Sequence, residues 1–490
     1  MSLLDDKFKN HFTVIIQNIF VFLMIMGIMI VSLLEEGTTF EGAIPVLLGT
    51  GVLGLLWSLY CIIAWSRTNF YVTDEEIIKE YKFIGRSKKV VNFNKVASVN
   101  IRRTFFNRIF GTSTVLVNVN SSVNAGVPEI SFVLKKDLAN VVKDELAAKM
   151  YGLNYTSEKE EVYGSVVEFS NKDSILHGLL GNSSSSILIS LGSIVFTIIF
   201  FTYDLAEIGL LLILSVVSMA VTMISLIIRY YNFRVYRLGD TIYLSHGAIQ
   251  LYTTSFKVNK INAVKIKRTL FARMLGKASI EVEVVGLNTE GSTPVLCILT
   301  SMENVQKIID EVVPDFKYDV EGLHQPKVAA YPWLMKAFLG SATTAFVALL
   351  IIGAMYNDRE VLEYFDISIE LAVGAVIACF IVLAIVYFGL AHLAFNSHKF
   401  DLGDDTFLVQ FGVLDHTRAI IQYDRVQSSD VSSMPMPRRL GLARINVSLL
   451  SSMGKMKIQS GYFERDMLDK VSDIVLERLA NGKYDYRKLI

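Results

Sequence analysis

The stretch Asp424-Arg425-Val426-Gln427-Ser428-Ser429, followed by Arg438-Arg439-Leu440-Gly441, occurs in three related copies along the chain. The other copies begin at Asn94 and Asn259, and each also leads to an arginine with a glycine three residues later. These pairs are Arg108 and Gly111, Arg273 and Gly276, and Arg438 and Gly441. The intervals are equal, since 259 − 94 = 165 and 424 − 259 = 165. A constant period that nearly fills 490 residues indicates tandem duplication of a domain.

Two long apolar runs precede each copy. They are Phe12–Leu34 and Ala43–Trp65, Ile187–Tyr203 and Ile208–Ile228, and Trp333–Tyr356 and Ile369–Phe395. Each run is close to the roughly 20 residues that a helix needs to cross a bilayer. Composition agrees, with 52% hydrophobic residues, 19% charged residues and a mean hydropathy of +0.44. We therefore predict six transmembrane helices in three hairpins. The first run is too long for a signal peptide and no cleavage site follows it, so we expect it to be retained.

The charges beside these runs predict the orientation. Acidic residues occupy the short linkers inside the hairpins: Glu35, Glu36, Glu41, Asp204, Glu207, Asp358, Glu360, Glu363 and Asp366. Basic residues occupy the opposite flanks: Lys7, Lys9, Arg67, Arg229, Arg234, Arg237, Lys327, Lys336 and Lys399. Because Lys and Arg near a membrane favour its cytoplasmic side, we predict a multi-pass cell-membrane protein. Both termini and all three soluble domains are expected in the cytoplasm.

The soluble part of each unit is predicted to be a series of strands followed by one helix. In the third unit, Gly403-Asp404-Asp405 marks a hairpin turn, and strands are expected at 419–423, 443–449 and 455–459. Apolar residues at helical spacing then predict a helix over Arg465–Ala480, matched by Asp137–Met150 and Met302–Val313. Short strands with a terminal helix favour a small barrel or sandwich closed by that helix. The predicted hairpins are 1–66, 161–229 and 323–395, and the predicted soluble domains are 67–160, 230–322 and 396–490.

The arginine and glycine motif resembles that of the bacterial pleckstrin-homology (PH)-like domains in the YdbS/YdbT membrane protein family. It is best preserved in the third copy, whereas the first two copies have Asn-Lys in place of Asp424-Arg425 and no leucine after the glycine. The resemblance covers essentially the whole chain and implies a polytopic α-helical membrane protein with three α+β domains. Each domain would be a seven-stranded barrel capped by its C-terminal helix. The resemblance implies no known ligand, and some proteins of this type are associated with resistance to membrane-active bacteriocins.

Enzyme signatures are not found in the sequence. Cys61, Cys297 and Cys379 lie far apart, and the seven histidines show no metal-ligand spacing. The glycines at 49, 51 and 54 imitate a phosphate loop but fall inside an apolar run, where small residues let helices approach. The net charge is zero and favours no nucleic acid. We therefore predict no catalytic residue, metal or cofactor.

Basic residues near the repeated arginines are candidate contacts for anionic lipid. Arg102 and Arg103 precede Arg108, and Lys265, Lys267 and Arg268 precede Arg273, whereas Ser432 and Ser433 take this place in the third copy. An anionic leaflet attracts such clusters by about 1 kcal/mol per charge. For the repeated arginines and glycines we favour a structural role, in which the guanidinium ties a loop to carbonyls and the glycine adopts a left-handed turn.

The functional hypothesis is a non-enzymatic membrane scaffold whose PH-like domains self-associate or bind a partner. Its expected partners are the lipid bilayer and either further copies of itself or a smaller YdbS-like membrane protein. The alternative is a lipid-handling or export component of the envelope. Ordinary solute transport is less favoured because ionisable residues such as Lys336, Glu370 and His392 sit at the ends of the runs rather than at mid-membrane.

Overall fold

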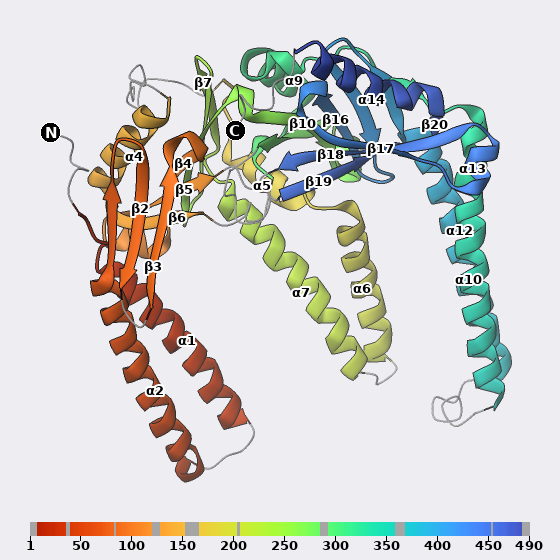
Figure 1. Cartoon of the computed structure of the whole chain (residues 1–490). Helices are drawn as coiled ribbons and strands as arrows, with labels where there is room; N and C mark the ends of the chain where they lie inside the picture. The colour runs from red at the N-terminus through yellow and green to blue at the C-terminus, as the bar shows by residue number, and fades with distance from the viewer. Residues whose placement is uncertain are drawn as a thin grey trace.

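The computed structural model describes residues 7–35, 40–82, 85–119, 128–151, 166–202, 206–284, 293–357, 368–451 and 454–482. Three helical hairpins extend from the same side of a row of β-rich domains (Figure 1). Most residues of the predicted acidic linkers, including Glu36, Asp204 and those between 358 and 366, lie outside the described residues.

Except for Phe12, the described residues of each predicted apolar run lie in a helix of one of these hairpins. The pairs are α1 (Thr13–Glu35) with α2 (Phe40–Arg67), α6 (Ser184–Thr202) with α7 (Ala206–Arg229), and α10 (Ala330–Asn357) with α12 (Ile369–Ser397). By length and composition, four spans qualify among the described residues: Leu48–Arg67, Leu212–Arg229, Lys327–Asn357 and Ile369–Ser397. A fifth would combine α5 (Asn171–Leu180) with α6 across a bend of 72°, and the apolar part described for α1, Thr13–Gly27, is shorter.

The hairpin helices expose large apolar side chains along their length. Leu55 of α2, Ile189 of α6 and Leu349 of α10 are 69%, 66% and 65% exposed. Such extended apolar surface is unfavourable in water and is the surface that lipid tails cover. The structure therefore agrees with a membrane location for the hairpins.

Every soluble domain contains two sets of three strands, and a 3-10 turn joins the third strand to the fourth. The first domain has β1 (Thr68–Val72), β2 (Glu76–Lys82), β3 (Arg86–Asn92), η1 (Phe93–Lys95), β4 (Val96–Arg103), α3 (Phe105–Ile109), β5 (Thr112–Val119), β6 (Ile130–Lys135) and α4 (Lys136–Tyr151). The second has β7 (Arg234–Leu238), β8 (Thr241–His246), β9 (Leu251–Lys257), η2 (Val258–Lys260), β10 (Ile261–Arg268), α8 (Leu270–Met274), β11 (Lys277–Val284), β12 (Val295–Ser301), α9 (Met302–Val312) and η3 (Pro314–Phe316).

The third domain repeats the same order. After β13 (Leu323–His324) and η4 (Lys327–Ala329), which flank the start of the third hairpin, it has β14 (Lys399–Leu402), β15 (Thr406–Phe411), β16 (His416–Gln422), η5 (Tyr423–Arg425), β17 (Val426–Ser432), α13 (Pro435–Arg439), β18 (Leu442–Ser451), β19 (Gly454–Gln459), β20 (Phe463–Glu464) and α14 (Arg465–Ala480). The terminal helices α4, α9 and α14 lie where the sequence predicts them.

The hydrophobic core of a domain lies between its two sets of strands and under its terminal helix. In the first domain, Phe70 and Ile77 from the first set, Val115 and Phe132 from the second, and Leu146 from α4 are all buried in one cluster. Among the described residues a closed seven-stranded barrel is not found, so this part of the prediction is not confirmed. The reason is the 3-10 turn, which carries the chain from one sheet to the other instead of joining β3 to β4 by hydrogen bonds.

Neighbouring domains share their sheets. The second set of the first domain and the first set of the second domain form one six-stranded sheet, in the order β6-β5-β4-β9-β8-β7. In the same way, β12-β11-β10-β16-β15-β14-β13 joins the second domain to the third. Both junctions are antiparallel, with Ile101 opposite Thr253 in one and Ile266 opposite Arg418 in the other. The three domains therefore form one continuous row.

Candidate functional site

The repeated arginine and glycine lie in a short helix and the turn after it, which we call the arginine corner. The three corners consist of α3 with Gly111, α8 with Gly276, and α13 with Gly441. These glycines have φ angles of +63°, +65° and +70°, the left-handed conformation that the structural interpretation requires. An added Cβ would meet no atom within 4 Å at any of them, so the constraint comes from the backbone conformation and not from crowding.

The first two corner arginines bind the following domain. Arg108 donates through Nη1 to the carbonyl oxygens of Ala248 and Ile249, which lie just before β9. Arg273 Nη1 lies 2.8 and 2.6 Å from the ring nitrogens of His416, the first residue of β16. Burial, together with the Arg273 guanidinium, lowers the pKa of His416 and keeps a neutral ring available as an acceptor. The corner arginines therefore fasten one domain to the next.

Arg438 lies in the third domain and bonds within its own loop. Its Nη2 donates to the carbonyl of Ser433 over 3.1 Å, in an exposed position. Arg438 thus makes the kind of contact that the structural interpretation predicts, between the guanidinium and a carbonyl of its own loop. For Arg108 and Arg273 the acceptors belong to another domain, which no local sequence pattern reveals.

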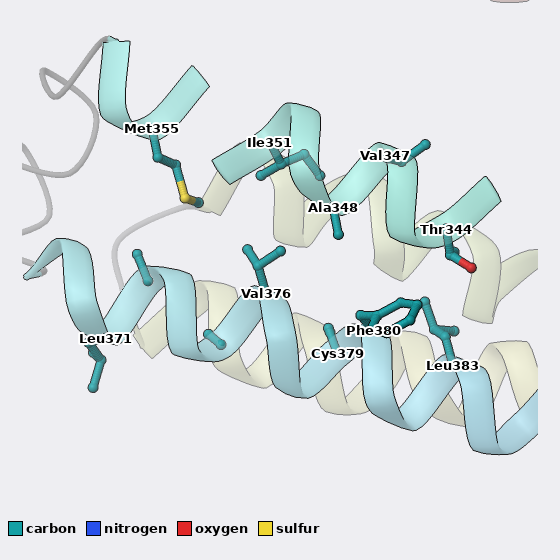
Figure 2. A pocket seen from close by; sticks show the side chains of 12 residues that line it. Thr344, Val347, Ala348, Ile351, Met355, Leu371, Val376, Cys379, Phe380 and Leu383 are labelled. Carbon is teal, nitrogen blue, oxygen red and sulfur yellow. The ribbon is translucent and has the colours of Figure 1, made fainter. Parts of the chain in front are cut away.

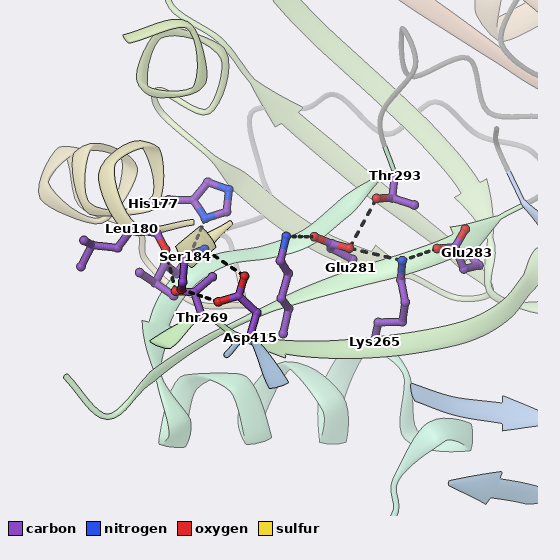
Figure 3. Close-up of polar contacts among 11 residues, drawn as sticks. His177, Leu180, Ser184, Lys265, Thr269, Glu281, Glu283, Thr293 and Asp415 are labelled. Carbon is purple, nitrogen blue, oxygen red and sulfur yellow. Dashed lines mark hydrogen bonds and ion pairs between the residues drawn. The ribbon is translucent and has the colours of Figure 1, made fainter. Parts of the chain in front are cut away.

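A second junction joins the middle hairpin to the last two domains (Figure 3). The Asp415 carboxylate accepts hydrogen bonds from the backbone N–H of Ser184, over 2.9 Å, and from its hydroxyl. It also accepts from Leu270 N at the start of α8, over 3.2 Å. Thr269 Oγ1 donates to the carbonyl of Leu180 over 2.6 Å. One aspartate of the third domain thereby fixes the start of α6 against the second domain.

A network of ion pairs lies between β10 and β11, in the sheet that the second and third domains share (Figure 3). Lys265 Nζ lies 2.5 Å from Glu283 Oε1 and 3.3 Å from Glu281 Oε2, and Lys267 Nζ lies 3.4 Å from Glu281 Oε1. Burial lowers the pKa of Lys265, but the two carboxylates outweigh it and raise the pKa above its ordinary value. Burial also opposes the charge of Glu281, yet Lys267 and Lys265 hold its pKa below the usual range. Lys265 and Glu281 are therefore both charged at neutral pH.

The residues that were predicted to contact lipid differ in how far they are buried. Lys265 is buried and already paired with carboxylates, so its charge is neutralised inside the protein. Lys267 and Arg268 are partly exposed at the end of β10, as are Arg102 and Arg103 at the end of β4. For these four residues lipid contact stays a prediction.

The arginine corners also carry exposed apolar side chains beside the hairpins. In α3, Phe105 and Ile109 are 57% and 61% exposed. The same helix packs on α1, where the Phe106 and Phe20 rings lie 4.8 Å apart and Gln17 Nε2 donates to Asn107 Oδ1 over 2.9 Å. Met274 and Leu275 in the second corner and Met434 in the third are likewise exposed. This pattern was not predicted, although the apolar residues beside each repeated arginine are visible in the sequence.

An apolar groove of about 490 Å³ lies between the two helices of the third hairpin (Figure 2). Ala348 and Met355 of α10 face Val376 of α12 across it, and Cys379 and Phe380 also line it. The groove is in the half of the hairpin remote from the soluble domain. Its lining suits a lipid tail or an apolar side chain.

Comparison with known proteins places these features in a family. The model of the bacterial PH domain matches residues 19–150, 186–313 and 347–479, which is most of the chain. The chain is also similar to the UPF0699 transmembrane protein YdbT of Bacillus subtilis (strain 168), with 20% identity over 447 residues, 84% of this chain and 85% of the relative. No solved structure matches it. The chain belongs to the bacterial PH domain family, and the predicted resemblance is confirmed.

Proposed function

We propose that this bacterial PH domain protein is a non-enzymatic membrane scaffold that holds proteins at the cytoplasmic face of the cell membrane. The observation that carries the proposal is the sharing of sheets between neighbouring domains. Main-chain pairing, the corner arginines and Asp415 together make three domains into one extended platform. Such a platform offers a long surface of fixed shape, anchored by three hairpins. The setting we propose is protection of the envelope, including protection against bacteriocins.

Purification of the complete chain from native membranes in mild detergent tests the scaffold. We expect a protein, either a second copy with a different tag or another membrane protein, to be retained in near-equal amount. Asp415→Ala removes the acceptor for Ser184 and Leu270 and should weaken this retention. Asp473→Ala, an exposed change on α14, is the matched control and should leave it intact. Retention of lipid alone, with no protein partner, would reject the scaffold.

The groove in the third hairpin supports lipid handling as the second candidate function. Ala348 lines the groove, whereas its neighbour Leu349 is not among the lining residues and is 65% exposed. If the groove holds a lipid tail, Ala348→Trp should fill it and reduce the lipid that copurifies, as measured by mass spectrometry. Leu349→Trp adds the same side chain to the outer surface and should have no effect. Equal lipid content in both variants would argue against a lipid site in the groove.

We propose in addition that the first corner contacts anionic headgroups through Arg102 and Arg103, with Phe105 and Ile109 at the membrane surface. A photoactivatable anionic lipid should label this corner of the complete protein in vesicles. Labelling should decrease as salt rises toward about 0.5 M, because exposed charges are then screened. It should also decrease on Arg102→Gln with Arg103→Gln. Labelling of the third corner to the same extent would contradict an electrostatic contact.

A further inference from the structure

Both junctions between domains use the same pair of strands in the same register. A shift of 165 residues carries Ile101 opposite Thr253 onto Ile266 opposite Arg418. The fourth strand of one domain therefore always meets the third strand of the next. The same strand pairing, in the same register, thus occurs at both junctions between domains.

Among the described residues, the two ends of the row leave one member of each pair without its counterpart. The strand β3 occupies the position of β9 and β16, and it lies at the edge of the sheet β1-β2-β3. The strand β17 occupies the position of β4 and β10, and it is also an edge strand among the described residues. All six residues of Ile261–Ile266 in β10 are buried, whereas Gln427, Ser428, Asp430 and Ser432 in β17 are exposed. Arg86–Val90 of β3 is likewise exposed.

We propose that β17 of one copy pairs with β3 of a second copy, so that the protein assembles head to tail in the membrane. The proposal rests on the scaffold function above and names its partner as a second copy of this chain. In the register of the two internal junctions, Val431 lies opposite Lys88 and Asp430 lies opposite Lys89. Directly opposed residues of unlike charge stabilise an antiparallel pair. The free edge of β17 thus gains an ion pair from β3 as well as main-chain hydrogen bonds.

Charged residues on β3 make the pairing selective. Arg86, Lys88 and Lys89 are the kind of edge residues that prevent indiscriminate strand addition. In the single chain Lys89 forms an ion pair with Glu129. An acid opposite Lys89 on an added strand gives this cation a second carboxylate and lowers the barrier, and β17 offers Asp430. Arg438, which among the described residues bonds its own loop, is placed to reach the second copy as Arg108 and Arg273 reach the next domain.

The membrane permits this assembly. The internal junctions keep all three hairpins on one side of the row (Figure 1). A second copy that is joined through β17 and β3 in the same register has its hairpins in the same bilayer. Because the two surfaces differ, the contact is heterologous and generates a ring if it closes and an open row if it does not.

Disulfide cross-linking between differently tagged complete chains tests the register. In a background with Cys61, Cys297 and Cys379 replaced, we expect Asp430→Cys in one chain to cross-link to Lys89→Cys in the other. The control is Asp430→Cys with Lys88→Cys, since adjacent residues of a strand point to opposite faces. That pair should cross-link far less. Equal cross-linking by both pairs, or none by the first, overturns the proposal.

Charge reversal provides a second test that does not depend on introduced cysteines. Asp430→Lys should weaken self-association of the complete chain in detergent by about tenfold, and Lys89→Asp in the partner chain should restore it. Asp473→Lys on α14 is the matched control and should change nothing. A chain that stays monomeric in every case but retains another protein refutes the second copy and leaves the scaffold standing. A chain that retains neither refutes both.

Discussion

Replacing Lys265 by methionine leaves the Glu283 carboxylate, whose side chain is fully buried, without its cation. Methionine keeps the length of the side chain but removes the charge. Breaking a buried ion pair by removing one partner costs about 3–5 kcal/mol, because the remaining charge is uncompensated. The matched control is Lys267→Met. Lys267 is 29% exposed and lies 3.4 Å from Glu281, so its loss should cost at most about 1 kcal/mol.

Hydrogen exchange of β10, β11 and β16 in the complete chain is the appropriate assay. The protein has several domains, so a single melting temperature does not report this one site. A loss of 3–5 kcal/mol corresponds to about a hundredfold or greater acceleration of exchange, at 1.36 kcal/mol per tenfold. Lys265→Met with Glu283→Leu removes both charges and should recover most of the protection, since apolar replacement of a buried pair is often neutral. Exchange of the single variant within about threefold of the wild type, or no recovery in the double variant, would refute the reasoning.

The pH dependence follows from the two pKa shifts. The pKa of Lys265 is raised above 10.5, so its contribution is complete below pH 10.5 and disappears as pH rises through the folded value. The pKa of Glu281 is lowered below 4.5, so its contribution is complete above pH 4.5 and disappears as pH falls through the folded value. The difference in exchange between wild type and Lys265→Met should therefore be largest between these limits and shrink toward alkaline pH.

Three further predictions concern the turn, the orientation and the histidines. Gly441→Val should destabilise the third domain by about 1–2 kcal/mol because it forces a left-handed β-branched residue, whereas Gly441→Asn should cost less. Equal protection of β18 from hydrogen exchange in the two variants would contradict this account. Cysteines introduced at Asn357 and at Gly37, which lies outside the described residues, should react with an impermeant thiol reagent on intact cells in a cysteine-free background. One at Gly454 should not, and its labelling would reverse the orientation. Burial lowers the pKa of His246 and His398 to about 4, so unfolding in detergent should become easier as pH falls from 6.5, by up to about 3 kcal/mol for each. His246→Phe should reduce this slope, and greater stability in acid would show that the sign is wrong.

Local features of this protein could be predicted from the sequence because they depend on nearby residues. The apolar spacing of Arg465–Ala480 gives the boundaries of α14, and a repeated glycine after a short helix indicates a left-handed turn. Strand partners could not be predicted in this way. The residues of β4 and β10 indicate strands, but nothing in them says that their free edges meet a strand some 150 residues later rather than close a barrel.

Lys265 illustrates why the candidate site was only partly predictable. In the sequence it stands beside Lys267 and Arg268 and looks like part of a basic surface. Its neutralising partners, Glu281 and Glu283, lie on the next strand, and β16 of the third domain pairs with the other edge of β10. The basic cluster itself encodes neither contact.

The junctions also explain why the third copy of the motif differs from the first two. Arg102 and Arg103 in β4, and Lys267 and Arg268 in β10, are each paired with a strand of the following domain. Their counterparts Ser432 and Ser433 lie on or beside β17, with which no following strand pairs among the described residues, and Arg438 bonds its own loop. The loss of basic residues thus coincides with the end of the row. A lipid role for the first two clusters alone does not account for this coincidence, whereas a change of partner at the last edge does. Pairing of β17 with the basic strand β3 of another copy would make additional cations there unfavourable, and an acid at Asp430 favourable.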